Sequence, residues 1–197
     1  MHRTNVEGTA KVLAAASKAG VRHFVCASSV GAYSPAPKDQ RTKEGWPTGG
    51  IKSSHYIADK AEQERLLDRF ATENPDIVVA RLRPALMFSP GGGSEVGRYV
   101  LGRVLPRLVP RKPWLPVLPF PLPVLRAVVE VSWRLRLQVT DGGWVDMAAN
   151  APIMDCARAH SLLGWPPKHS SLESLAEMLE GIGAGKGRRG SPPLRPR

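Results

Sequence analysis

Three side chains of this sequence, Ser29, Tyr56 and Lys60, are of types that could transfer a proton together. Tyr56 and Lys60 are four residues apart, so on a helix they lie on the same face. A phenol is a poor base at neutral pH, but an ammonium within about 4–6 Å stabilises its phenolate form. Tyr56 could then take a proton from a substrate hydroxyl while a hydride leaves for an oxidised nicotinamide, or return the proton in a reduction.

Ser29 follows the apolar run of residues 23–27, which predicts a strand. Ligands of open α/β sheets gather at the carboxyl ends of strands, so Ser29 could bond the same substrate oxygen. Each feature also has an ordinary explanation. A tyrosine and a lysine at this spacing are more often a surface pair, and a serine at a strand end more often caps a helix. The order of strand, serine and capped helix, with 27 residues from Ser29 to Tyr56, favours the site.

The elements that would position these residues alternate between helix and strand. In chain order we expect a helix over residues 4–19 that begins with a Thr4–Glu7 capping box and ends at Gly20, a buried strand over 23–27, an irregular stretch over 34–55, a helix over 55–71 that begins at Ser53 or Ser54, and a buried strand over 76–82. Apolar, non-alternating strands between helices predict an α/β fold with a doubly wound parallel sheet.

The C-terminal half does not continue the alternation of helices and strands. Prolines dominate residues 105–123, and helices are expected over 123–137, after Asp155, and from Ser170 or Ser171. We therefore expect three parts: residues 1–97 with the sheet, residues 98–182 with a proline-rich segment and a small, mostly helical region on the substrate side, and residues 183–197 as a disordered basic tail.

The net charge of +11 is concentrated in two segments. Residues 98–138 carry +7 and residues 181–197 carry +5, which leaves −1 for the rest of the chain. Such segments could bind nucleic acid or an anionic membrane. No recognised nucleic-acid motif accompanies them, so this is the least favoured of the hypotheses.

The sequence shows no transmembrane stretch and no secretory signal. Its two cysteines make neither a disulfide framework nor a metal site. We therefore expect a cytoplasmic protein without a metal.

Five short motifs, in this order, resemble those of the extended short-chain dehydrogenases/reductases, the NAD-dependent epimerase/dehydratase family. They are N-V-E-G-T at residues 5–9, F-V-C-A-S-S-V-G-A-Y at 24–33, Y-I-A-D-K at 56–60, L-R-P-A-L-M-F-S-P-G at 82–91, with Ser89 where the family usually has glycine, and L-G-W-P-P at 163–167. The resemblance implies a partial Rossmann-like fold.

The resemblance also implies roles for individual residues. Tyr56 would be the general acid/base, Ser29 the partner of the substrate oxygen, and Lys60 the ligand of the nicotinamide ribose. Asn5 would support the helix that carries the site, and Pro84 would border the nicotinamide and substrate. The cofactor-binding residues would be Lys60, Tyr56, Pro84 and Asn5. The cofactor would be NAD or NADP, and the substrate a small molecule with a hydroxyl or keto group, such as a sugar nucleotide or a steroid-like alcohol. A homodimer would form through residues 5–19 and 55–71.

The sequence departs from the family in one important respect. The family's G-x-x-G-x-x-G loop, which places a pyrophosphate on a helix N-terminus, is absent. We therefore expect an N-terminally truncated member that lacks its first strands, leaves a sheet edge and apolar surface uncovered, and binds the intact cofactor poorly. The alternative to an enzyme is a non-catalytic α/β remnant or regulatory module of the same family.

Overall fold

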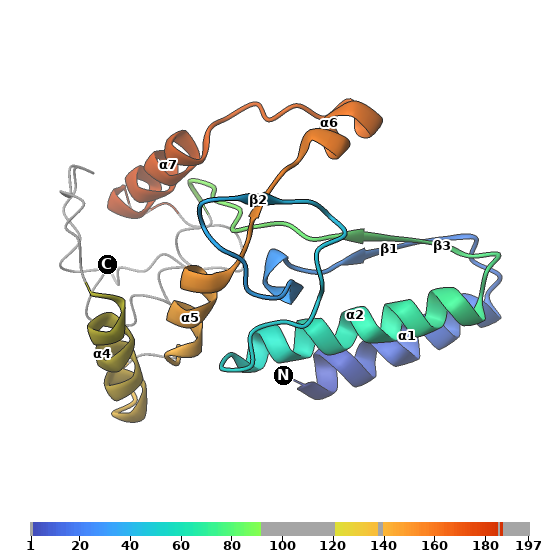
Figure 1. Ribbon diagram of the computed structural model, residues 1–197, viewed down its shortest axis with the longest axis horizontal. Coiled ribbons are helices and arrows are strands. Elements are labelled where there is room, and N and C mark those ends of the chain that lie inside the picture. Colours follow the sequence, from blue (N-terminus) through green and yellow to red (C-terminus); the bar gives the residue numbers. More distant parts are fainter. Residues whose placement is uncertain (1, 92–120, 138–139, 185, 187–197) are drawn as a thin grey trace. The chain divides into compact units, whose positions relative to one another are not determined.

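The computed structural model describes residues 2–91, 121–137, 140–184 and 186 (Figure 1). They form two compact units. The first spans Met1–Ala85 and Asp146–Ala157, and the second comprises the described parts of Leu86–Val145 and Arg158–Arg197. The three candidate catalytic residues all belong to the first unit.

The first unit contains two small parallel sheets and two long helices. Its elements are a π-helical segment (Arg3–Glu7), α1 (Gly8–Lys18), β1 (His23–Ala27), a 3₁₀ turn (Val30–Ala32), β2 (Arg41–Thr42), α2 (His55–Glu73), β3 (Val78–Leu82), the end of α5 (Gly143–Asn150) and β4 (Ile153–Met154). β1 pairs with β3 from His23↔Val78 to Ala27↔Leu82, and β2 pairs with β4. The expected α/β class with a parallel sheet is confirmed.

α1 and α2 lie side by side along one face of the β1–β3 pair (Figure 1). The core between them is formed by Leu13, Cys26, Leu67 and Phe70. The other face of the two strands is exposed among the described residues, with Val25, Val78 and Leu82 each more than half accessible. The prediction of fully buried strands is therefore wrong for one face, where alternate side chains meet no described partner layer.

The observed helix ends can be compared with the ends that the sequence predicted. The π-helical segment stands where the first helix was expected to start, and no side-chain bond caps it, so the predicted Thr4–Glu7 capping box is wrong. Gly20 has a φ of 66°, as expected of a glycine that ends a helix. α2 begins after Ser54, which is one of the two predicted starts.

The second unit holds the remaining helices. α4 (Leu122–Arg134) has a proline in its first turn. α6 (Ala157–Leu163) begins after Asp155, whose carboxylate accepts a bond from the Ala157 N–H. α7 (Ser171–Gly183) begins with a reciprocal capping box between Ser170 and Glu173. These starts agree with the sequence, whereas α5 was not predicted. The expectations for residues 98–120 and for the tail beyond 186 lie outside the described residues.

No helix in the described ranges is both long and apolar enough to cross a bilayer. Within the same residues, no three His, Cys, Asp or Glu side chains are grouped in a way that could hold a metal ion.

Candidate active site

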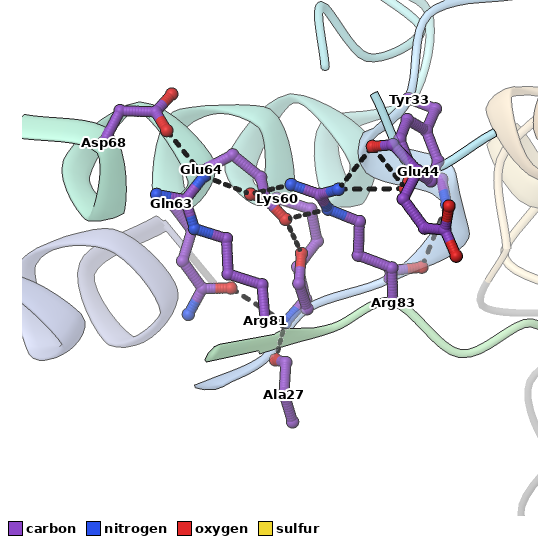
Figure 2. A network of polar contacts seen from close by, with 12 residues as sticks. Ala27, Tyr33, Glu44, Lys60, Gln63, Glu64, Asp68, Arg81 and Arg83 are labelled. Atoms are coloured by element: carbon purple, nitrogen blue, oxygen red, sulfur yellow. Dashed lines mark hydrogen bonds and ion pairs between the residues drawn. The ribbon is translucent and has the colours of Figure 1, made fainter. Parts of the chain in front are cut away.

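Lys60 is fixed against the carboxyl end of β1 (Figure 2). Its Nζ donates to the Ala27 carbonyl at 3.0 Å and to Gln63 Oε1 at 3.0 Å. Gln63 in turn donates from Nε2 to Thr9 Oγ1 at 2.8 Å, which ties the lysine to α1. An ammonium carries three donors, and these two bonds leave one N–H for a ligand.

Tyr56 lies one helical turn before Lys60 on α2 and is half-buried. The Lys60 Nζ is 6.0 Å from the centre of its ring. The shared helix face that the spacing predicted therefore brings the ammonium close to the phenol.

The first turn of α2 packs directly onto the 3₁₀ turn that follows Ser29. Ile57 is completely buried there, and a Cβ added to Gly31 would lie 2.0 Å from Ile57 Cδ1. Only a glycine permits so close an approach. Ser29 and Tyr56 are therefore carried by two segments in direct contact, at the carboxyl end of β1.

The two serines after β1 have different partners. Ser29 is half-buried, and its Oγ accepts a bond from the Gly31 N–H at 3.1 Å, which caps the 3₁₀ turn. Because a hydroxyl both accepts and donates, this bond leaves the O–H of Ser29 able to donate to a substrate oxygen. Ser28 is buried, and its hydroxyl donates to Glu64 Oε1 at 2.5 Å.

The other two candidate residues, Pro84 and Asn5, contact the segments that carry Ser29 and Lys60. Pro84 does so through its backbone carbonyl, and Asn5 does so through its side chain. The Val30 N–H donates to the Pro84 carbonyl at 3.0 Å, so the segment after β3 runs alongside the residue after Ser29. Asn5 Nδ2 donates to Asp59 Oδ2 at 3.2 Å. Asp59 precedes Lys60, so this bond joins the N-terminal segment to α2 next to the lysine.

A buried carboxylate that we did not single out from the sequence lies one turn beyond Lys60. Glu64 has no exposed surface, and Arg83 grips it with two bonds, Nε to Oε1 and Nη2 to Oε2, both 2.8 Å (Figure 2). Burial alone would raise the pKa of Glu64, but the bonds from Arg83 and Ser28 outweigh it and hold that pKa below its usual value. Glu64 is therefore charged at neutral pH.

Arg83 extends the same network to the irregular segment after β1. Its Nη1 donates to the Tyr33 hydroxyl at 2.9 Å and to the Glu44 carbonyl at 3.2 Å (Figure 2). The bond with Glu64 raises the pKa of Arg83, so this side chain is permanently charged. This ion pair thus joins α2 to the residues that directly follow β1 and β3 and to Tyr33 and Glu44.

The sequence carried a signal for this network. Glu64 falls on the same side of α2 as the buried Ile57, Ala61 and Leu67, where a charge needs a partner. Arg81 and Arg83 interrupt an otherwise apolar stretch. A buried acid on a helix and basic residues in the adjoining strand together indicate an internal ion pair.

A surface hollow at the opposite end of the unit contains none of these residues. It is lined by Ser17, Arg22 and Asn74, among others, beside the amino ends of β1 and β3. Ligands of parallel α/β sheets bind at the carboxyl ends, so this hollow is not the candidate site.

The parallel α/β unit, with Ser29, Tyr56 and Lys60 near the end of β1, has the arrangement that the family resemblance implies, and the comparisons identify the family. The model of the NAD dependent epimerase/dehydratase family matches residues 1–118, which is more than half of the chain. The chain therefore belongs to this family. No curated protein sequence matches it at a significant level.

Two solved structures are similar in fold. One is the UDP-glucose 4-epimerase of Thermus thermophilus in complex with NAD, with a TM-score of 0.54 and 20% identity over 91% of this chain and 70% of that chain. The other is MoeE5 in complex with UDP-glucuronic acid and NAD, with a TM-score of 0.54 and 21% identity over 90% of this chain and 70% of that chain. At these identities the likeness supports the fold, which agrees with the Rossmann-like expectation.

Proposed function

We propose that the protein is an NAD(P)-dependent oxidoreductase, epimerase or dehydratase that acts on a hydroxyl or keto group of a small substrate. The observation that carries this proposal is the attachment of Lys60 to the carboxyl end of β1, on the same face of α2 as Tyr56. In this role Tyr56 exchanges a proton with the substrate oxygen, and Ser29 donates a hydrogen bond to that oxygen.

The cofactor is NAD or NADP, and it would supply the hydride acceptor or donor. Two neighbouring structures contain NAD, and the family is defined by dependence on it. Lys60 would hold the nicotinamide ribose with the N–H that Ala27 and Gln63 leave unused. Its charge would also stabilise the phenolate of Tyr56.

Within this proposal, sugar nucleotides are the first substrate class to consider. The complexes of the two similar structures, one a UDP-glucose 4-epimerase and one with UDP-glucuronic acid, make this substrate class the first to test.

Titration calorimetry with NAD and with NADP tests the nicotinamide pocket. We expect binding that weakens roughly 10- to 100-fold in Lys60→Ala, because hydrogen bonds to charged groups contribute about 1.5–3 kcal/mol. Lys18→Ala removes an exposed lysine from the last turn of α1 and should leave the affinity unchanged. No binding of either cofactor by protein with a native circular dichroism spectrum would favour the alternative, a non-catalytic or regulatory α/β module.

We also propose a homodimer through residues 5–19 and 55–71. Its support is a surface groove between α1 and α2, lined by small residues such as Ala10 and Ala14, into which a second pair of helices could pack. Sedimentation velocity should show a dimer that Ala14→Glu dissociates. Ala15→Glu, one residue outside the groove, is the control. A monomer at all concentrations would overturn this proposal.

A further inference from the structure

The end of β1 is held at two successive residues by side chains one turn apart on α2. Lys60 bonds the carbonyl of Ala27, and Glu64 accepts from the hydroxyl of Ser28. Ser29, the candidate partner of the substrate oxygen, is the next residue. Its position relative to Tyr56 therefore depends on how α2 is held against the strand.

Glu64 also holds the residue that follows β3 in place. Its two bonds with Arg83 fix the residue immediately before Pro84, and the Pro84 carbonyl accepts from the Val30 N–H on the other side of Ser29. Ser29 is thus bracketed by two attachments, at Ser28 and at Val30. The Glu64 carboxylate holds the side chain of Ser28, whose N–H also donates to the Leu82 carbonyl at 2.7 Å, and it acts on the second attachment through Arg83.

In the ion pair between Arg83 and Glu64 the carboxylate is fully buried and the two bonds are bidentate. This geometry fixes how α2 lies against the end of β3. By contrast, Asp68, one turn further along α2, is largely exposed and bonds Arg81 in the interior of β3. Arg81 also lies within 3.5 Å of Glu64, so the two acids share this arginine, but only Glu64 touches the segments that flank Ser29.

We propose that Glu64 is a positioning residue of the active site, which acts through Ser28 and Arg83 to set the place of Ser29 against Tyr56. The functional meaning of this placement rests on the proposed function. The placement itself is a property of the folded chain that is measurable without cofactor or substrate.

The test is a nuclear magnetic resonance spectrum of protein with ¹³Cζ-labelled tyrosine, in which the Tyr56 signal is assigned by its loss in Tyr56→Phe. We expect Glu64→Gln and Ser28→Ala to shift the Tyr56 signal of the folded protein at pH 7, and both to weaken NADH binding several-fold. Ser28→Ala changes no charge, so a shift in both variants reports altered position and not merely a lost charge. Glu62→Gln is the matched control, because this carboxylate of α2 accepts from Arg65 of the same helix and not from the network, and it should leave the signal in place.

A purely structural role makes a different prediction. In that case Glu64→Gln lowers the melting temperature, while the Tyr56 signal and the NADH affinity stay at their wild-type values, and the proposal is overturned. If Glu64→Gln does not fold, Ser28→Ala decides by the same criterion. If wild-type protein does not bind NADH, the proposed function fails, but the Tyr56 signal still tests the positioning.

Discussion

Tyr56→Phe is expected to abolish turnover while the fold and the cofactor affinity stay close to wild type. The substitution removes only the phenolic oxygen, and the ring of Tyr56 remains beside Lys60. General acid/base catalysis contributes about 10²–10⁴-fold to a rate, so we expect a loss of that size. The assay is NADH formation, or interconversion of epimers, with a panel of UDP-sugars at saturating NAD.

The cofactor titration of the same variant is its control. Because Lys60 and not Tyr56 is assigned to the ribose, the affinity of Tyr56→Phe for NADH should change less than that of Lys60→Ala. A Tyr56→Phe protein that retains more than about a tenth of the wild-type rate would exclude Tyr56 as the general acid/base.

Local sequence rules predicted the parts of the site that depend on one element. Tyr56 and Lys60 share a face because α2 is helical at this point, and the start of α2 near Ser54 is readable from the serines that precede it. Similarly, the strand that ends before Ser28 follows from five residues of β1. None of these inferences requires knowledge of which segments meet in space.

The parts that the sequence analysis missed depend on pairs far apart in the chain. Arg83 is 19 residues from Glu64 and 50 residues from Tyr33, so charged residues at buried positions can signal an ion pair but not which residues meet. The same limit explains the exposed side chains of Val25 and Leu82, since apolar composition predicts a tendency to be buried and not the partner that buries them. The π-helical segment at residues 3–7 likewise replaces a capping box that the local pattern favoured.

Arg83→Met is expected to produce the largest loss of stability among the substitutions considered. It removes the bidentate partner of the buried Glu64 carboxylate, which keeps only Ser28 and a 3.5 Å contact with Arg81, and breaking a buried pair from one side costs about 3–5 kcal/mol. The double variant Glu64→Met, Arg83→Met leaves no uncompensated charge and should be considerably more stable than Arg83→Met alone. Urea unfolding at pH 7 gives both values.

The pH dependence of this loss identifies its cause. In the wild type the pKa of Glu64 is lowered, so its contribution to stability is complete above the ordinary value of 4.5 and is lost as the pH falls through the lower native pKa. Without Arg83, burial of Glu64 is offset only by Ser28 and Arg81, so the pKa of Glu64 is higher in the variant than in the wild type, and the variant gains stability relative to wild type as this carboxyl becomes protonated. The difference between the two proteins should therefore shrink as the pH falls through the higher pKa of the variant toward the lowered pKa of the wild type. If the difference in free energy of unfolding stays constant from pH 7 to pH 4, Arg83 stabilises the fold by packing and not by compensating the charge of Glu64.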